Sequence, residues 1–262
     1  MAIHKTRAVV LNTYPYSDGS LIVHLATRRF GRLSVIAKGA RRPKSKMHTQ
    51  LDRLYVVDVV VYFKPGRSVQ TLSDVSVEEF FPELRRSLPR FYAAHYACEL
   101  VETGLPEEQP NAPLFDRLVL GLRECDQLPV DRLALWALHF DASVLGYLGL
   151  SPSLERCGAC GRENPFRGSA TISLSAGSVI CRGCRASGHE PTQAFPLSAA
   201  ALRTWRLLAV PAGSPAAKTL LTETEVPRRV IGELRGFMNR FLPFHLERQL
   251  RLQKHLPAPG AR

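Results

Sequence analysis

The sequence predicts an α+β, multidomain chain, in which an N-terminal five-stranded β-barrel is followed by a helical domain with a four-cysteine insertion. Three observations lead to this prediction. Strand-like patterns run to about residue 80, helical spacing of apolar residues follows, and two matched cysteine pairs interrupt the helical part. With 262 residues, of which 45% are hydrophobic, the chain is long enough for two modest domains and apolar enough to pack them.

The first domain is expected to span residues 1–81 and to consist of short strands. A turn-rich stretch at residues 14–19 ends the first strand, and residues 55–63 are almost continuously β-branched or aromatic. The predicted strands are residues 7–11, 21–26, 32–37, 55–63 and 69–77. Five short strands fit a small closed barrel, which leaves no exposed sheet edge. The five-stranded barrel best known for binding oligonucleotides is the OB-fold, although an SH3-like barrel fits the pattern almost as well.

The second domain, residues 82–256, is expected to be helical. Apolar residues recur at helical spacing in segments around 91–101, 114–122, 133–147, 197–208 and 228–255. Pro243 is expected to kink or break the last of these helices. An insertion at about 154–191 is poor in large apolar residues and is predicted to lack a core of its own. The tail, residues 257–262, is expected to be disordered.

The insertion contains the most specific motif of the chain. Two CxxC pairs are separated by 20 residues, and their members are Cys157, Cys160, Cys181 and Cys184. Each CxxC turn directs two thiolates at one point, so the two pairs supply the four ligands of a tetrahedral zinc site. A shell of four thiolates has no open position for water, which predicts one structural Zn²⁺ in a zinc-ribbon-like insertion. Cys98 and Cys125 lie in apolar helical stripes and are expected to be core residues.

The chain is strongly basic, with a formal net charge of +12, and the cations are clustered. Between Arg28 and Arg67 there are eleven Lys and Arg residues but only two acids. Such clustering favours a polyanionic partner. The predicted DNA-contact residues are Arg28, Arg29, Arg32, Lys38, Arg41, Arg42, Lys44 and Lys46.

Aromatic residues near these cations are few, so DNA binding is expected to depend more on phosphate contacts than on stacking. Tyr14 and Tyr16 lie in the first turn, and Phe30 lies beside two arginines. Tyr55, Tyr62 and Phe63 fall in the most apolar strand and are expected to be core residues. A barrel of this kind should accept both single- and double-stranded DNA with little base preference.

Catalytic motifs are not found, and the prediction is a protein that is not an enzyme. A zinc deaminase needs H-x-E before its P-C-x-x-C, but the only such triplet, residues 245–247, follows both cysteine pairs. The sequence contains no HExxH, Walker-type loop or GxSxG. No apolar run approaches the ~20 residues of a membrane helix, and the N-terminus does not resemble a signal peptide. These features predict a cytoplasmic protein without a membrane partner.

Several stretches, in the same order along the chain, resemble the bacterial RecO family of DNA repair proteins. They are Ala8-Val9-Val10-Leu11, a strand from Gly31 that runs into Lys38-Gly39-Ala40-Arg41-Arg42-Pro43-Lys44-Ser45, Leu72-Ser73-Asp74-Val75, and Leu145-Gly146-Tyr147-Leu148-Gly149-Leu150-Ser151-Pro152 before Cys157. The resemblance implies an OB domain, a helical domain and a zinc-binding insertion. It also implies a nucleoid-associated recombination mediator that anneals complementary strands. With RecR, such a mediator helps to load the RecA recombinase onto strands coated by single-strand-binding protein (SSB).

The C-terminal part departs from the resemblance and offers a candidate partner site. Residues 246–253 match the family's basic, serine-containing ending only loosely. The candidate partner-binding residues are Arg228, Arg229, Arg235, Phe237, Arg240 and Phe241. An apolar surface rimmed by cations would suit the acidic, hydrophobic-ended tail of SSB, but the aromatics could equally be core residues with solvated arginines around them.

Two other functions remain open from the sequence alone. A basic OB domain with a zinc ribbon also fits an RNA-binding or transcription-associated protein. A metal-dependent nucleic-acid enzyme is the third candidate. Competition between DNA and RNA separates the first two functions, and loss of activity on chelation in a folded protein would favour the third.

Overall fold

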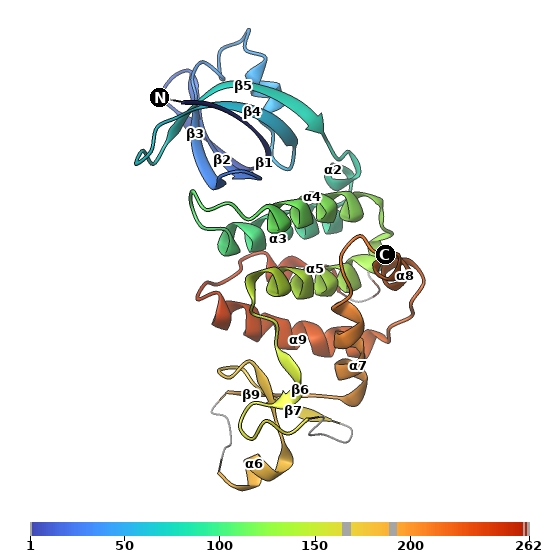
Figure 1. Cartoon of the computed structure of the whole chain (residues 1–262). Coiled ribbons are helices and arrows are strands. Elements are labelled where there is room, and N and C mark those ends of the chain that lie inside the picture. The colour runs from blue at the N-terminus through green and yellow to red at the C-terminus, as the bar shows by residue number, and fades with distance from the viewer. Residues whose placement is uncertain (1, 164–168, 189–192, 259, 261–262) are drawn as a thin grey trace. The chain divides into compact units, whose positions relative to one another are not determined.

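The computed structural model describes residues 2–163, 169–188, 193–258 and 260. The chain divides into two compact units, residues 1–127 and 128–262. Each unit has its own strands and helices, most of which are labelled in Figure 1. No helix in the described part of the chain is both long and apolar enough to cross a membrane.

The first unit begins with a closed five-stranded barrel, as the strand pattern predicts. Its strands are β1 (Ala2–Tyr16), β2 (Ser20–Thr27), β3 (Gly31–Ala37), β4 (Val56–Phe63) and β5 (Gln70–Glu79). The strand order is β1-β2-β3-β5-β4, β3 and β5 are parallel, and β1 closes the barrel by pairing with β4. Alternate side chains fill the interior, among them Val10, Val23, Val35, Val59 and Leu72.

Strand β1 is longer than the sequence indicates. The turn-rich stretch at 14–19 was expected to end the strand, but β1 continues to Tyr16. Its first half pairs with β4 and its second half with β2. The register shifts between Val10 and Asn12, and such an irregularity bends a strand so that it can serve two partners.

The helices of the first unit pack beside the barrel. They are α1 (Met47–Gln50) between β3 and β4, and α2 (Glu83–Arg86), α3 (Leu88–Gly104) and α4 (Ala112–Gln127) after β5. Glu79 at the end of β5 accepts hydrogen bonds from Arg7 of β1 and from Arg123 of α4, the latter at 2.7 Å. The first compact unit, residues 1–127, therefore contains these helices as well as the barrel.

The turn between β2 and β3 meets the α3–α4 connection backbone to backbone. Arg32 N donates to Pro106 O at 3.2 Å, and Glu108 N donates to Arg32 O at 3.2 Å. Gly31 has φ +67°, and a Cβ atom there would lie 2.1 Å from the carbonyl oxygen of Gln109. Only glycine permits both this backbone conformation and this close approach.

We expect Gly31→Ala to destabilise the first unit by about 3 kcal/mol, because it adds a backbone clash to an unfavourable φ. Gly66→Ala is a matched control, since Gly66 has φ +74° but a Cβ atom there would meet nothing within 4 Å. In the control, the free energy of unfolding should fall by only about 1 kcal/mol. Urea unfolding of the two variants measures the difference, and equal losses would contradict a role for the close approach.

The second unit is built on packed helices. They are η1 (Val130–Arg132), α5 (Leu133–Leu148), α7 (Ala199–Leu208), α8 (Pro215–Thr222), α9 (Arg228–His245) and η2 (Gln253–His255). Helix α5 packs against α7 and α9, and His139 Nδ1 lies 3.0 Å from Leu208 O. The large buried side chains include Trp136, Phe140, Phe237 and Phe241.

Two helix predictions for this unit need correction. The last helix ends at His245, not near residue 255, and its end lies two residues after Pro243, where the sequence predicts a kink or break. Proline lacks a backbone N–H and disfavours helix. Shortly after the helix ends, the backbone of Glu247 adopts a left-handed conformation with φ +51°. Helix α8 was missed, although Ser214 caps it by accepting from Ala217 N, and Pro215 starts it. Of the predicted tail, residues 259, 261 and 262 lie outside the described part.

The insertion of the second unit forms a small sheet. Its elements are β6 (Ser153–Cys157), β7 (Ala170–Ser173), β8 (Ser178–Ile180), α6 (Arg182–Ala186) and β9 (Ala194–Leu197), with strand order β6-β8-β7-β9. The prediction that this segment buries no core was too strong, because Leu154, Ile172, Val179 and Leu197 are buried. Parts of the insertion, residues 164–168 and 189–192, lie outside the described residues.

Candidate metal centre and nucleic-acid interface

The structure brings the four predicted cysteines together. The sulfur atoms of Cys157, Cys160, Cys181 and Cys184 all lie within 4.8 Å of one another. Cys157 Sγ is 3.9 Å from Cys184 Sγ, and Cys160 Sγ is 3.8 Å from Cys181 Sγ. Four sulfurs around one ion at ~2.3 Å would be roughly 3.8 Å apart, so the quartet can hold a tetrahedrally coordinated metal ion.

Tight backbone turns position these sulfur atoms. Gly161 N donates to Cys157 O at 2.8 Å, which closes the first CxxC turn, and Cys184 N donates to Cys181 Sγ at 3.4 Å in the second. Cys181 N donates across to Cys157 Sγ at 3.3 Å. A Cβ atom at Gly158 would lie 1.9 Å from Ser178 Oγ, so the first turn packs directly on β8.

The backbone also stabilises negative charge on the quartet. Burial alone would raise the pKa of the Cys157 thiol, but N–H groups of Cys181, Cys160 and Ala159 lower it to about 6. Hydrogen bonds with the Cys181 and Cys160 sulfurs raise the pKa of Cys184 to about 12. Four ionised thiolates in so small a volume need a cation between them, and metal binding would release the remaining protons.

The other two cysteines are core residues, as the sequence predicts. Cys98 lies in α3 and Cys125 in α4, and both are buried. Burial raises the pKa of Cys98 to about 12 and raises that of Cys125 as well. Neither belongs to the cysteine cluster found among the described residues.

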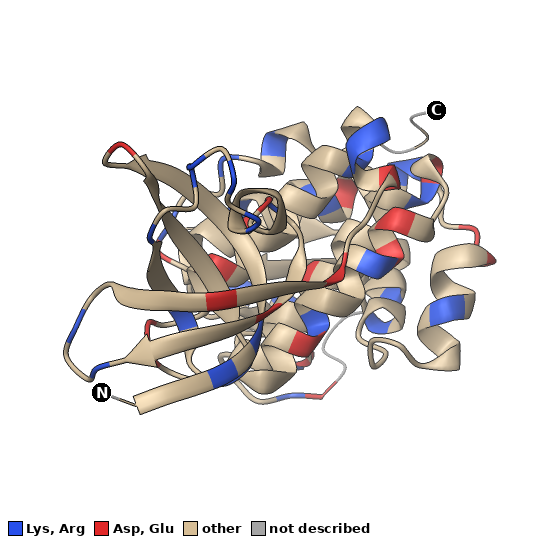
Figure 2. Cartoon of the chain, turned by 90° about the horizontal axis from the view of Figure 1, so that it is seen from above, with Lys and Arg blue, Asp and Glu red and all other residues tan. Residues whose placement is uncertain are grey.

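The predicted basic loop is an exposed connection of the barrel. It leads from β3 into α1, and its cations Lys38, Arg41, Arg42, Lys44 and Lys46 are all exposed. None of them takes part in an ion pair among the described residues. The charge colouring of Figure 2 shows mostly uncharged barrel strands, with many of the basic residues in the connecting loops. We call Lys38, Arg41, Arg42, Lys44 and Lys46 the basic loop.

The basic loop is held against the turn between β1 and β2. Arg41 N donates to Gly19 O at 3.1 Å, and Arg41 Nη1 donates to Ser17 O at 3.4 Å. The Arg42 side chain approaches Gly19 and Gly39, where a Cβ atom would lie 3.7 Å and 3.6 Å from it. The loop and the turn therefore form one surface.

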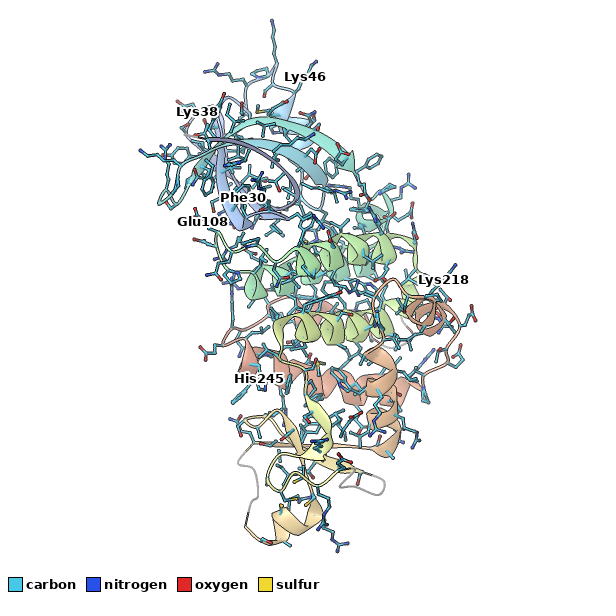
Figure 3. All side chains as sticks on the ribbon, viewed as in Figure 1. Phe30, Lys38, Lys46, Glu108, Lys218 and His245 are labelled. Atoms are coloured by element: carbon cyan, nitrogen blue, oxygen red, sulfur yellow. The ribbon has the colours of Figure 1, made fainter. Side chains whose placement is uncertain are left out.

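The three earlier arginines lie elsewhere. Arg28 donates to both carboxylate oxygens of Asp116, at 2.9 and 3.1 Å, and Arg32 pairs with Glu107 at 3.1 Å. Arg29 lies 5.4 Å from the centre of the Phe30 ring. Figure 3 shows Phe30 at the end of the barrel next to Glu108, and Lys46 at the opposite end. The structure does not bring these arginines together with the basic loop.

Of the two alternatives for the aromatic residues of the candidate C-terminal partner site, the structure shows the core one. Phe237 and Phe241 are fully buried, because they face the core side of the amphipathic helix α9. Of the arginines, Arg235 donates to Gln253 O at 3.0 Å and Arg240 lies over the Phe195 ring. Arg228 and Arg229 are exposed at the start of α9.

An accessible aromatic residue does lie on this helix, but the sequence reasoning missed it. Phe244 is 40% exposed and lines a cavity of about 550 Å³ together with Leu174, Ala194, Arg240 and Pro243. Nearby, His245 Nε2 lies 2.9 Å from Leu174 O, in the turn between β7 and β8. The available signal in the sequence was that Phe244 follows Pro243, which marks the expected end of the helix.

Comparison with known proteins identifies the family of this chain. The family model for the recombination protein O N terminal matches residues 1–81, and that for its C terminal matches residues 85–254. The DNA repair protein RecO of Rhodopirellula baltica is 32% identical, with 95% of this chain and 97% of the relative covered. That of Anaeromyxobacter dehalogenans is 32% identical, with 98% and 96% covered, and that of Symbiobacterium thermophilum is 34% identical, with 79% and 80% covered. The chain therefore belongs to the RecO family.

Proposed function

We propose that this protein is a DNA-binding recombination mediator that acts in DNA repair and has no catalytic activity. The basic loop carries the proposal. Five exposed cations lie on a loop of a closed barrel and form no ion pair with any described carboxylate, so their charge is available to phosphates. The family relationship to DNA repair proteins makes DNA the expected polyanion.

We interpret the barrel as an OB-fold. Support comes from its five strands, its closure through a bent β1 and the order β1-β2-β3-β5-β4. We assign DNA contacts to the basic loop, and we leave out Arg28 and Arg32, because each faces a carboxylate in its own unit. Contacts through phosphates alone suit both single and double strands.

We propose that the cysteine quartet binds one structural Zn²⁺. Closed tetrahedral shells of four thiolates are typical of zinc, and the sulfur separations fit that geometry. Such a shell has no open position for an activated water molecule. The ion would therefore stabilise the insertion and take no part in a reaction.

The proposed partners follow from the family and from one cavity. We expect RecR, SSB and, indirectly, the RecA filament as partners at the nucleoid in the cytoplasm. The cavity beside Phe244 combines an apolar wall with the cation Arg240. We assign it to the C-terminal tail of SSB, which ends in acidic and apolar residues.

Strand annealing tests this function. The full chain should accelerate annealing of complementary DNA strands coated with SSB, and a competing RNA of the same sequence should displace the DNA only weakly. No acceleration at any protein concentration would contradict the mediator function. Stronger competition by RNA would favour the RNA-binding alternative.

The same assay separates DNA binding from SSB recognition. Arg240→Ala with Phe244→Ala should slow annealing of SSB-coated strands about tenfold and leave annealing of bare strands unchanged. Equal annealing of coated strands by parent and variant would contradict the assignment of the cavity.

A further inference from the structure

The outer face of the β1–β2–β3 sheet carries aromatic side chains next to the basic loop. Because side chains alternate along a strand, Tyr14 and Tyr16 of β1 share this face with Ile22 and His24 of β2. The register continues across the sheet, since Tyr14 pairs with Ile22, which pairs with Ile36 of β3. We call Tyr14, Tyr16, Ile22, His24 and Ile36 the outer face.

The rings of the outer face are accessible, and one is held in place. Tyr14 is 45% exposed and Tyr16 is 54% exposed. The Tyr14 ring lies 5.2 Å from the His24 ring, and its hydroxyl accepts a hydrogen bond from Asn12 Nδ2 at 2.6 Å. These rings are therefore available to an external planar group.

A second aromatic cluster on the barrel is arranged differently. Phe30 and Phe63 stack on each other with ring centres 5.2 Å apart, and His4 packs against both. Their rings cover one another and are partly buried. The outer face has the more exposed rings of the two.

The outer face continues into the basic loop. Tyr16 is followed by the Ser17–Gly19 turn, whose carbonyl oxygens accept both hydrogen bonds from Arg41. Lys38 follows the last residue of β3, two positions after Ile36. Rings for bases and cations for phosphates are thus side by side on one surface.

We propose that the outer face stacks unpaired bases and makes the barrel prefer single-stranded to double-stranded DNA. The inference rests on the proposed function and names the form of DNA that its site selects. Every base has a π-face, so stacking on Tyr14 and Tyr16 is tolerant of sequence. Bases within a duplex are covered by their neighbours, so a duplex is held by the basic loop alone. This modifies the sequence-based expectation that binding is mainly electrostatic.

The test compares a double variant, Tyr14→Ala with Tyr16→Ala, with the parent. Its affinity for a single-stranded oligonucleotide should fall about tenfold or more, and its affinity for a duplex of equal length less than about twofold. The salt dependence should be unchanged, because no phosphate contact is lost. Fluorescence anisotropy with labelled DNA measures each quantity.

Two controls isolate the rings. Tyr14→Phe with Tyr16→Phe keeps the rings and should keep the preference for single strands. Tyr147→Ala removes a tyrosine that is also 45% exposed but lies in the second unit, and it should change neither affinity. Equal affinities of the Ala variant and the parent for single strands, or an equal loss on single and double strands, would overturn the proposal. A parent that binds neither form of DNA would instead contradict the proposed function itself.

Discussion

Replacement of Cys181 by Ser is expected to abolish zinc binding and to unfold the insertion, residues 153–197. A structural zinc site contributes about 10–16 kcal/mol of apparent binding energy at pH 7, far more than the few buried side chains of this small sheet. Cys181 also accepts a hydrogen bond from Cys184 N, so its loss opens the second CxxC turn. Metal analysis should find one zinc per parent chain and none in the variant. Hydrogen exchange should rise in the insertion but not in the barrel, which has a core of its own.

Cys98→Ser is the matched control for this experiment. Cys98 is a buried cysteine of α3 outside the quartet. The control should destabilise the first unit and retain one zinc per chain. A parent that contains no zinc after gentle purification, or a Cys181→Ser chain with a full zinc content and a protected insertion, would contradict the assignment.

Arg41→Ala with Arg42→Ala is expected to weaken DNA binding about tenfold or more, whatever the DNA sequence. Both side chains lie on the exposed basic loop and pair with no carboxylate in the described part of the chain, so we expect their removal to take away phosphate contacts and no base-specific contact. Affinities for two single strands of unrelated sequence and for one duplex measure the effect. They should fall by similar factors.

Arg28→Ala with Arg32→Ala removes the same number of charges from the same barrel. Because these side chains pair with Asp116 and Glu107, we expect their loss to affect the contact with the α3–α4 segment and to change DNA affinity less than about threefold. A larger loss of affinity in this control than in the Arg41 and Arg42 variant would place the DNA elsewhere on the barrel.

The features that the sequence predicted well depend on local signals. The five strands were predicted from alternation of apolar residues and, for residues 55–63, from a continuous run of β-branched and aromatic residues, and both patterns are properties of a single strand. The spacing of the two CxxC pairs predicted the quartet, since each knuckle is a short turn that forms its own geometry. The basic loop could be recognised because Gly39 and Pro43 mark an exposed connection.

The features that the sequence predicted poorly depend on contacts between residues that are far apart in the chain. Nothing near Arg28 indicates that Asp116, 88 positions later, will neutralise it. The apolar stripe of α9 looks the same whether it faces a core or a partner, so only the fold shows that Phe237 and Phe241 are buried. The individual strands of the insertion were not located, because they have only three to five residues.

The salt dependence of single-strand affinity tests the central proposal, phosphate binding by the basic loop, most directly. If three to five of its cations contact phosphates, the logarithm of the affinity should fall with the logarithm of salt concentration with a slope of about −2 to −3.5. Arg41→Ala with Arg42→Ala should flatten this slope by about 1.4, since each single-strand contact contributes ~0.7. An affinity of the parent that is nearly independent of salt, or the same slope in parent and variant, would contradict the proposal.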